Sequence, residues 1–287
     1  MSVSAAEDLA GVRLLAAGSG WRVSDIVCRA GPRDRVLDEA HQLTVVAAVV
    51  GGTFTYQNDA GTTFLAPGSF LLAEAGGAFR CSHQRPGGDR CVAFHVTPAF
   101  VEETATDVPG VTESRFASNR LPPLAARLPL LTEVAAFAGG RDGSGEELAL
   151  RMVGAALRPE PGGRPAPETV ARRDLERVAD AVHFIDAECE TSVALRDLAE
   201  RVGLRRYHFL RTFRRVVWET PYRYLLNRRL ALAAERLTTT SDRVLDVALA
   251  SGFGDLSEFT RRFRSRFGLP PAAYRRLHRT YRAGGRR

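Results

Sequence analysis

Residues 251–271 read SGFGDLSEFTRRFRSRFGLPP, and in this stretch an arginine stands beside almost every phenylalanine. Phe259, Phe263 and Phe267 are spaced by four, which places the three rings on one face of a helix. The arginines fall mostly on the other side of that helix. The pattern therefore predicts a helix whose aromatic face packs into a core and whose basic face points outward.

The same pattern occurs earlier in the chain, which indicates an internal repeat. Asp197, Ala199 and Gly203 recur 49 residues later, and after one inserted residue the offset becomes 50. Ordered identities of this kind in a short span indicate a duplicated unit. The identical pairs are Asp197 and Asp246, Ala199 and Ala248, Gly203 and Gly252, Phe209 and Phe259, Arg211 and Arg261, Phe213 and Phe263, Pro221 and Pro271, and Tyr224 and Tyr274.

Each copy has the pattern of a helix-turn-helix. In the first copy, VALRDLAERVG predicts a short amphipathic helix that ends at Gly203, because glycine readily takes the positive φ of a sharp turn. The following RRYHFLRTFRRVV begins a second helix. We expect the two helix-turn-helix units over about residues 195–217 and 244–267, joined by a helix that begins at Pro221.

The outward face of each second helix suits a polyanion. Residues 168–287 contain 25 arginines and 15 acidic residues, whereas residues 1–167 contain 15 arginines and 18 acidic residues. A basic domain of this kind favours nucleic acid. An arginine row fits the major groove, where a guanidinium grips guanine O6 and N7 while other arginines hold phosphates. The outward residues are Arg206, Tyr207, Leu210, Arg211 and Arg214 in the first copy, and Ser257, Thr260, Arg261 and Arg264 in the second.

Residues from about 193 to 276 resemble the DNA-binding domain of the AraC/XylS family of bacterial transcription regulators. The resemblance rests on LRDLAERVGL, RTF, TPYRYLLNRRLALAAERL and VALASGFGDLSEFTRRFRSRFGLPPAAYRR. It implies two helix-turn-helix units joined by a long helix, and a regulator that activates or represses nearby promoters. It implies double-stranded DNA as the partner and RNA polymerase as a candidate contact. By position it implies base-facing side chains at Tyr207, Leu210 and Arg211, and at Leu256, Ser257, Thr260 and Arg261.

Two of these base-facing positions depart from the family pattern. Leu210 and Leu256 replace polar residues that are often found there. A leucine side chain cannot hydrogen-bond a base edge, so it reads either the methyl group of thymine or nothing.

The first half of the chain predicts a β-rich domain. Between residues 21 and 97, short runs such as TVVAAVV, GTFTYQ and RCVAFHV are rich in β-branched and aromatic residues and are separated by turn residues. Strands without helices between them indicate a sandwich or barrel. Regulators of the resembled family often carry a cupin-like barrel for effector binding or dimerisation, and GTTFLAPG at 61–68 resembles its Gly-x5-Pro turn.

The expected fold is therefore α+β, with a cupin-like β-barrel and helices followed by an all-α domain with two helix-turn-helix units. We expect a sensing or dimerisation domain over 1–157, the Pro/Gly-rich linker RPEPGGRPAPE over 158–168, and the DNA-binding domain over 169–287. A small-molecule effector and a homodimer are candidate partners. Helices over about 121–157 are a candidate dimer interface, the alternative being simple packing on the barrel.

Two other functions fit parts of the sequence. A cupin-type metalloenzyme with a helical tail would need a metal-ligand set. His41 has no His-x-His partner or following glutamate, and Phe79 stands near where a later histidine is expected. An architectural DNA binder without an effector would not need a folded front domain. We therefore expect a transcription regulator that is not an enzyme and uses no cofactor.

One cluster in the first half is a candidate sensor. In FRCSHQRPGGDRC at 79–91, a hairpin turning at 86–89 would place His83 opposite Cys91, with Cys81 on the same face as His83. These side chains suit a soft metal or a redox pair. Half-buried thiols beside a hydrogen-bonded histidine are the alternative, so no metal is assigned. Cys28 and Cys189 have no evident histidine companion and are interpreted as packing residues.

Nothing in the sequence indicates secretion or a membrane partner. The N-terminus lacks the charged-then-apolar pattern of a signal peptide. The longest strongly apolar run, at 45–50, is far too short to span a bilayer. Four cysteines in 287 residues do not make a disulfide framework. We expect a cytoplasmic protein.

Overall fold

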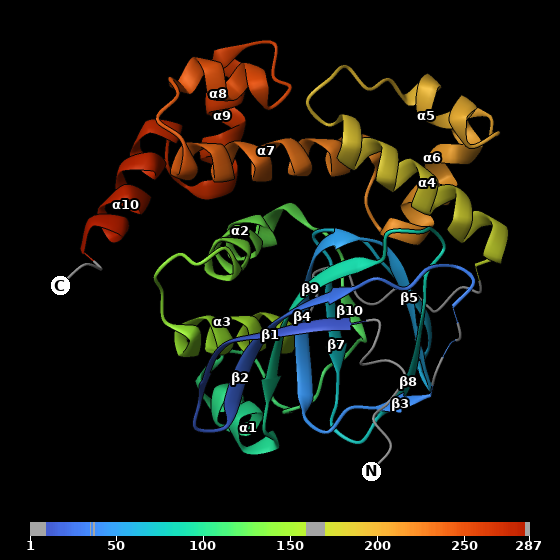
Figure 1. Ribbon diagram of the computed structural model, residues 1–287, viewed down its shortest axis with the longest axis vertical. Coiled ribbons are helices and arrows are strands. Elements are labelled where there is room, and N and C mark those ends of the chain that lie inside the picture. Colours follow the sequence, from blue (N-terminus) through green and yellow to red (C-terminus); the bar gives the residue numbers. More distant parts are fainter. Residues whose placement is uncertain (1–9, 35, 37, 159–169, 285–287) are drawn as a thin grey trace. The chain divides into compact units, whose positions relative to one another are not determined.

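The chain divides into two compact units in the computed structural model (Figure 1). The first unit comprises Met1–Pro122 and Ser144–Ala179, and the second comprises Pro123–Gly143 and Asp180–Arg287. The chain therefore enters the second unit, returns to the first, and enters the second again. The residues that the structure describes are 10–34, 36, 38–158 and 170–284.

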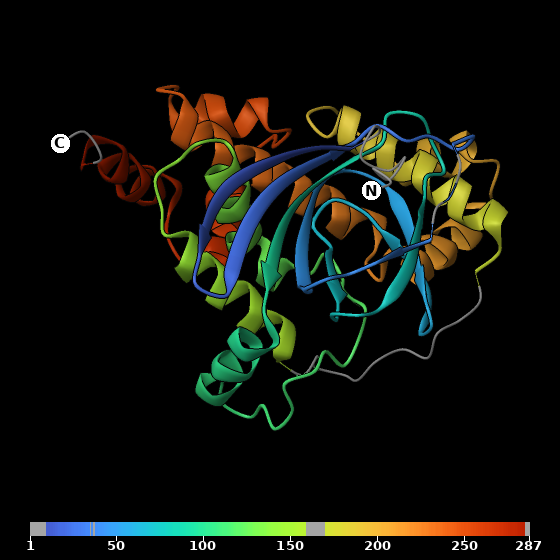
Figure 2. The ribbon, with the colours of Figure 1, turned by 60° about the horizontal axis from the view of Figure 1, so that its bottom comes forward.

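The first unit contains two antiparallel sheets. The larger sheet has the strand order β1-β2-β9-β4-β7-β10, and the smaller sheet has the order β3-β8-β5-β6. Figure 2 shows the two sheets facing each other. The strands are β1 (Ala10–Gly18), β2 (Trp21–Cys28), β3 (Glu39–Ala40), β4 (Thr44–Gly52), β5 (Phe54–Asn58), β6 (Gly61–Leu65), β7 (Phe70–Ala73), β8 (Ala78–Ser82), β9 (Asp89–Val96) and β10 (Arg120–Leu121).

The two sheets do not close into the barrel expected from the sequence. Within the described residues, no strand belongs to both sheets, so backbone hydrogen bonds do not join them. Side chains join them instead, because Val45 and Cys91 of the larger sheet share one hydrophobic core with Phe54 and Tyr56 of the smaller. The alternating pattern predicts strands, but barrel closure depends on pairing between strands far apart in the sequence, which the pattern does not specify.

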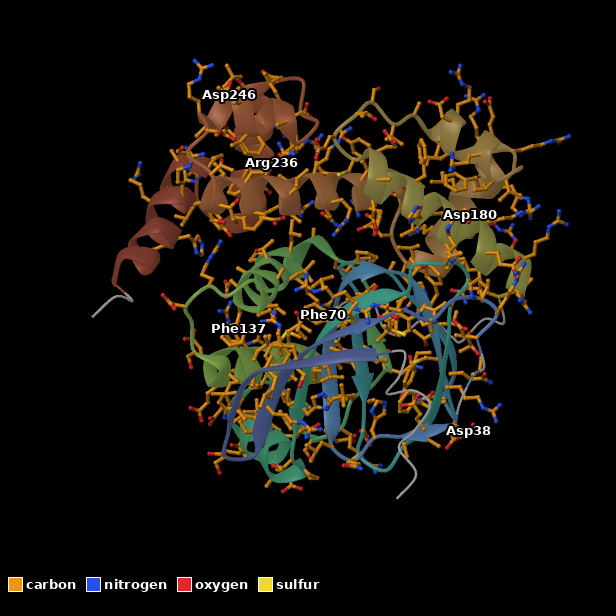
Figure 3. The ribbon with its side chains drawn as sticks, viewed as in Figure 1. Asp38, Phe70, Phe137, Asp180, Arg236 and Asp246 are labelled. Carbon is orange, nitrogen blue, oxygen red and sulfur yellow. The ribbon has the colours of Figure 1, made fainter. Side chains whose placement is uncertain are left out.

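The strand β4 has a nearly continuous apolar sequence because it is buried on both faces. Residues 44–49 are all buried, so both faces of the strand are covered. The inner face belongs to the shared core, and α3 (Gly145–Leu157) contacts β1, β2, β4 and β9. Ser144 caps α3 by accepting a hydrogen bond from the Glu147 amide at 3.1 Å. Phe70 on β7, labelled in Figure 3, is fully buried.

The expected hairpin around residues 86–89 is wrong. The strand β8 pairs with β3 and β5, whereas β9 pairs with β2 and β4. The connection therefore carries the chain from one sheet to the other. Gly87 and Gly88, with φ of 104° and 65°, provide the left-handed backbone that this crossing needs.

Helices of the second unit form the expected duplicated arrangement. The long helix α7 runs between the α5–α6 pair and the α8–α9 pair (Figure 1). α4 begins in the first unit and ends in the second. The remaining helices are α1 (Pro98–Asp107), η1 (Ala125–Arg127), α2 (Leu128–Ala138), α4 (Arg172–Glu188), α5 (Leu195–Arg201), α6 (Arg206–Val217), α7 (Pro221–Thr239), α8 (Val244–Ala250), α9 (Leu256–Phe267) and α10 (Pro271–Gly284).

The grouping of α2 differs from the expected domain boundaries. The sequence suggests that all helices over 121–157 belong to the first domain, but α2 contacts α7 and α9 of the second unit. Asn227 on α7 donates a hydrogen bond to the carbonyl oxygen of Pro123 at 3.1 Å, and Arg141 donates one to the hydroxyl of Thr238. The apolar face of a helix predicts that the face is buried, but it does not predict which element of the protein covers it. Except for Arg158, the expected linker lies outside the described residues.

Candidate nucleic-acid interface

Both predicted helix-turn-helix units are present, with matching geometry. The first is α5 and α6, and the second is α8 and α9; the leading helices have seven residues and the following helices have 12. Gly203 and Gly252 lie in the turns with φ of 65° and 80°. A side chain is strained in this conformation, so the glycines fix both turns.

The ends of the two following helices are formed by different residues. Asp255 begins α9 by accepting hydrogen bonds from the amides of Ser257 and Glu258 at 3.2 and 2.8 Å. Arg205 begins α6 without a side-chain cap. α9 ends at Gly268 with φ of 73°, whereas α6 ends at Trp218, which takes a φ of 64° despite its side chain.

The aromatic face of each following helix is buried, as the spacing predicts. Phe209 and Phe213 on α6 are fully buried, with ring centroids 5.7 Å apart. Their equivalents Phe259 and Phe263 on α9 are also fully buried, at 5.5 Å. In each copy the second of these rings meets the tyrosine of the next helix edge-on, so the two small cores are alike in composition.

The opposite face of α6 carries the expected DNA-binding residues at its surface. The ring of Tyr207 is open to solvent, since this residue is 78% exposed. Leu210 is half-buried beside it. The exposed arginines of this face are Arg206, Arg211 and Arg214.

The equivalent face of α9 is also open to solvent. Leu256 is 38% exposed and Thr260 is half-buried, while Ser257, Arg261 and Arg264 are exposed. All five predicted residues line one shallow, open depression. The depression also includes Ser265 and Gly268, which the sequence reasoning did not select. Ser265 lies one helical turn after Arg261 on the same face of α9, so the helical spacing alone could have identified it.

The arginines of the second unit fall into two groups. Some are bound within the unit: Arg228 donates to Asp186 at 2.7 Å, Arg236 to Glu190 at 2.8 Å, and Arg262 to Glu258 at 2.7 Å. Arg236 is labelled on α7 in Figure 3. The predicted DNA-binding arginines have no ion pair or hydrogen bond through their guanidinium groups to any described residue. These are Arg206, Arg211, Arg214, Arg261 and Arg264.

Side-chain hydrogen bonds join α7 to α4 and to α9 within the second unit. Arg228 and Tyr224 both donate to the carboxylate of Asp186 at the end of α4, and burial raises the pKa of that carboxyl. From α9, Arg262 donates to the hydroxyl of Tyr222 at 2.9 Å. Since Tyr222 lies at the start of α7, between the repeat residues Pro221 and Tyr224, this bond links α9 of the second copy to the first copy.

The candidate sensor residues lie in the first unit, but not in the expected arrangement. His83 binds Asp89 at 2.7 Å, and the thiol of Cys91 donates to the other oxygen of Asp89 at 3.3 Å. Cys81 faces Tyr56 on the neighbouring strand β5. Burial raises the pKa of the Cys81 and Cys91 thiols, which disfavours the reactive thiolate of a redox pair.

The sequence indicates no histidine companion for Cys28, but in the structure His83 lies beside it. Its sulfur lies within 4.8 Å of the ligand atoms of His83 and Asp89. Burial opposes protonation of His83, but hydrogen bonds with Asp89 and Cys28 raise its pKa to about 9. The sequence separation between Cys28 and His83 hides this contact, because it arises from the pairing of β2 with β9.

The comparisons with known proteins match this duplicated domain. A family model described as "Helix-turn-helix domain" matches residues 198–277. The HTH-type transcriptional activator AarP of Providencia stuartii is 31% identical over 98 residues, which cover 34% of this chain and 73% of that protein. The regulatory protein SoxS of Escherichia coli strain K12 is 32% identical over 98 residues, covering 34% of this chain and 92% of that protein. A solved structure, the DNA-binding domain of AdpA in complex with a target DNA, is 29% identical, with a TM-score of 0.37, covering 38% of this chain and 98% of that one.

The duplicated helix-turn-helix, together with its similarity to the family model and to AarP and SoxS, defines a DNA-binding transcription regulator. The chain belongs to the AraC/XylS-type family of bacterial transcription regulators. Members of this family are transcription regulators and are typically not enzymes. None of the described helices combines the length and apolar character that a membrane span requires.

Proposed function

We propose that the second unit binds one DNA duplex by placing α6 and α9 in successive major grooves. The observation that carries the proposal is the equivalence of the two helices: each buries a phenylalanine pair and presents, at the same register, an exposed arginine with no partner in the described residues. Arg211 and Arg261 are these equivalent arginines. Because both guanidinium groups are exposed and take no part in the ion pairs of the described residues, they are open to an external acceptor.

The length of α7 supports binding to one face of a duplex. Its 19 residues rise about 28 Å at 1.5 Å per residue. Successive major grooves on one side of B-DNA lie roughly 34 Å apart. Because α6 and α9 belong to the helix pairs at the two ends of α7 (Figure 1), their separation is of the right order for successive grooves.

The side chains of the proposed interface differ in what they read. We assign Arg211 and Arg261 to guanine, because a guanidinium matches the O6 and N7 acceptors. Leu210 and Leu256 are assigned to thymine methyl groups. The flanking arginines neutralise phosphates and set the register, and Tyr207, Ser257 and Thr260 complete the base-facing surface. The flanking arginines are Arg206, Arg214 and Arg264.

The first unit is proposed to sense an effector and to form a homodimer. Its antiparallel sheets enclose a core that is separate from the DNA-binding unit, as a sensing domain requires. Support for a homodimer comes from β1, an edge strand of the larger sheet on which Val12 and Leu14 are 64% and 61% exposed. Apolar edge strands favour pairing with a second copy. Contact with RNA polymerase is proposed from the family alone.

Site selection from random duplexes with the full-length protein tests the DNA-binding proposal. The expected product is a bipartite site whose halves are centred about 10–10.5 base pairs apart. The double variant Arg211→Ala/Arg261→Ala is expected to lose selection of both halves. Arg80→Ala is the matched control, since Arg80 is an exposed arginine of the first unit that is bound to Asp38. Selection of a single short site by the wild type, or an unaltered site with the double variant, would contradict the two-helix proposal.

A further inference from the structure

Three side chains with different donor atoms converge in the first unit. They are Cys28 at the end of β2, His83 just after β8, and Asp89 at the start of β9. The sulfur, an imidazole nitrogen and a carboxylate oxygen all lie within 4.8 Å of one another. Cys28 and Asp89 lie on paired strands of the larger sheet and His83 lies in the connection that leaves the smaller sheet, so the group exists only in the folded unit.

The backbone brings these donors together. Cys28 and Asp89 are register partners in the β2–β9 ladder. Gly88, with φ of 65°, lies so close that a β-carbon there would be 1.8 Å from the carbonyl oxygen of Cys28. Only glycine permits this approach. The crossing between the sheets therefore places the Asp89 carboxylate against the end of β2.

The Asp89 carboxylate is buried and has few partners among the described residues. The side chains of His83 and Asp89 are 4% and 9% exposed. Arg90 is next in sequence to Asp89, yet it binds Asp25 with hydrogen bonds of 2.8 and 2.9 Å. Within the described residues, Asp89 has side-chain hydrogen bonds only with His83 and Cys91. A buried carboxylate beside an imidazole and a thiol suits a compact cation that replaces their protons.

We propose that Cys28, His83 and Asp89 bind one zinc ion. Thiolate sulfur, imidazole nitrogen and carboxylate oxygen are the ligands that zinc takes in proteins, and three protein ligands leave a fourth position for water or an exogenous ligand. Calcium and magnesium prefer oxygen ligands alone, so the sulfur and nitrogen select against them. On binding, the Cys28 thiol and the His83 imidazolium each release one proton to solvent, and the imidazole nitrogen that faces Asp89 then binds the metal. The proposal concerns the first unit and stands apart from DNA recognition.

Cys91 acts as a positioning residue in this site. Its thiol donates to the Asp89 oxygen that does not face His83. A bond of this kind orients a ligating carboxylate, and its loss weakens metal binding by about 10–100-fold. Cys91→Ala, which removes this donor, is therefore expected to retain stoichiometric zinc with an affinity lower by that factor. Cys28→Ser removes a ligand and is expected to lower zinc affinity by a larger factor.

Metal analysis of the untagged full-length protein tests the proposal. The protein is stripped with a chelator, titrated with zinc alone, and analysed for bound metal. One zinc per chain is expected for the wild type and for Cys189→Ser, a buried cysteine of the second unit. Wild-type protein that remains folded and takes up no zinc would overturn the proposal, and so would unchanged affinity in both Cys28→Ser and His83→Ala.

Cobalt(II) supplies a second readout that does not depend on a variant folding. Cobalt in a site with a thiolate ligand gives a sulfur-to-metal charge-transfer absorption. The wild type is expected to show this band, and zinc is expected to displace it. Cobalt binding without the band would exclude Cys28 as a ligand and overturn the three-ligand site. Thermal unfolding of the wild type with and without zinc is expected to give a higher Tm with the metal.

Discussion

Arg229 donates a hydrogen bond from Nε to the carbonyl oxygen of Cys189 at 2.8 Å, and the turn glycine of the second repeat copy lies against both groups. A β-carbon at Gly252 would lie 2.6 Å from that oxygen and 2.8 Å from Nε. At the equivalent Gly203, no described heavy atom lies within 4 Å of such a carbon. The two turns share a backbone conformation but differ in their surroundings.

This difference predicts unequal effects of the same substitution. Gly203→Ala is expected to cost about 1 kcal/mol of stability, because alanine is strained at positive φ. Gly252→Ala carries the same strain and also overlaps backbone, which adds about 1–3 kcal/mol. Urea unfolding of the two variants, followed through helix content, measures both losses. Equal losses would show that the Arg229–Cys189 contact can shift to make room for the new methyl group without a loss of stability.

Arg261→Ala is expected to weaken binding to the selected DNA site by about 1–3 kcal/mol and to relax base preference in one half of it. A phosphate contact would weaken binding to all sequences alike, so Arg264→Ala provides the comparison. Fluorescence anisotropy on a set of single-base variants of the site, at fixed salt, separates these cases. Unchanged preference in the Arg261 variant would assign this guanidinium to the backbone.

Replacing Leu256 tests whether this side chain contacts the methyl group of a thymine in the DNA site. If it contacts a thymine, replacing that thymine with uracil removes the C5-methyl group and is expected to weaken wild-type binding, at about 0.8 kcal/mol for one buried carbon. The variant Leu256→Ala is expected to bind both duplexes equally. The four affinities form a double-mutant cycle. A uracil penalty that persists in the alanine variant would assign the methyl contact to another side chain.

A fragment from residue 168 to the C-terminus tests the role of α2. We expect this fragment to bind DNA in a salt-dependent manner, but to gain stability when a peptide of residues 123–143 is added. The peptide restores the Asn227–Pro123 hydrogen bond and the contacts of α2 with α7 and α9, and one such bond alone contributes about 1 kcal/mol. A scrambled peptide of the same composition is the control. If the native peptide leaves the unfolding midpoint of the fragment unchanged, α2 is not needed for the stability of the DNA-binding fragment.

The duplicated domain was predictable because its signals are local. The spacing of Phe259 and Phe263, the turn at Gly252 and the proline at the start of each next helix act within a few residues, and the repeat doubles each signal. The helix ends were less regular. Trp218 takes the left-handed conformation that Gly268 provides in the second copy, and a tryptophan gives no sequence signal for it.

The first unit was less predictable because its contacts are not local. The hairpin between β8 and β9 was a reasonable expectation, since successive strands usually pair, but β9 pairs with β2 and β4 instead. That pairing brings Cys28 to His83, which no spacing rule connects. Of the three proposed zinc ligands, the sequence-based sensor set therefore contained His83 but not Cys28 or Asp89.

The placement of α2 also fixes an order of events during synthesis. Roughly 80 residues separate the end of α2 at Ala138 from the start of α7 at Pro221, and at about 5–20 residues per second their translation takes roughly 4–16 s. During that interval the nascent chain holds an apolar helix whose permanent neighbours do not yet exist. The second unit is therefore completed only after the ribosome has finished α9, and a chaperone that shields apolar helices has a defined segment of this chain to cover until then.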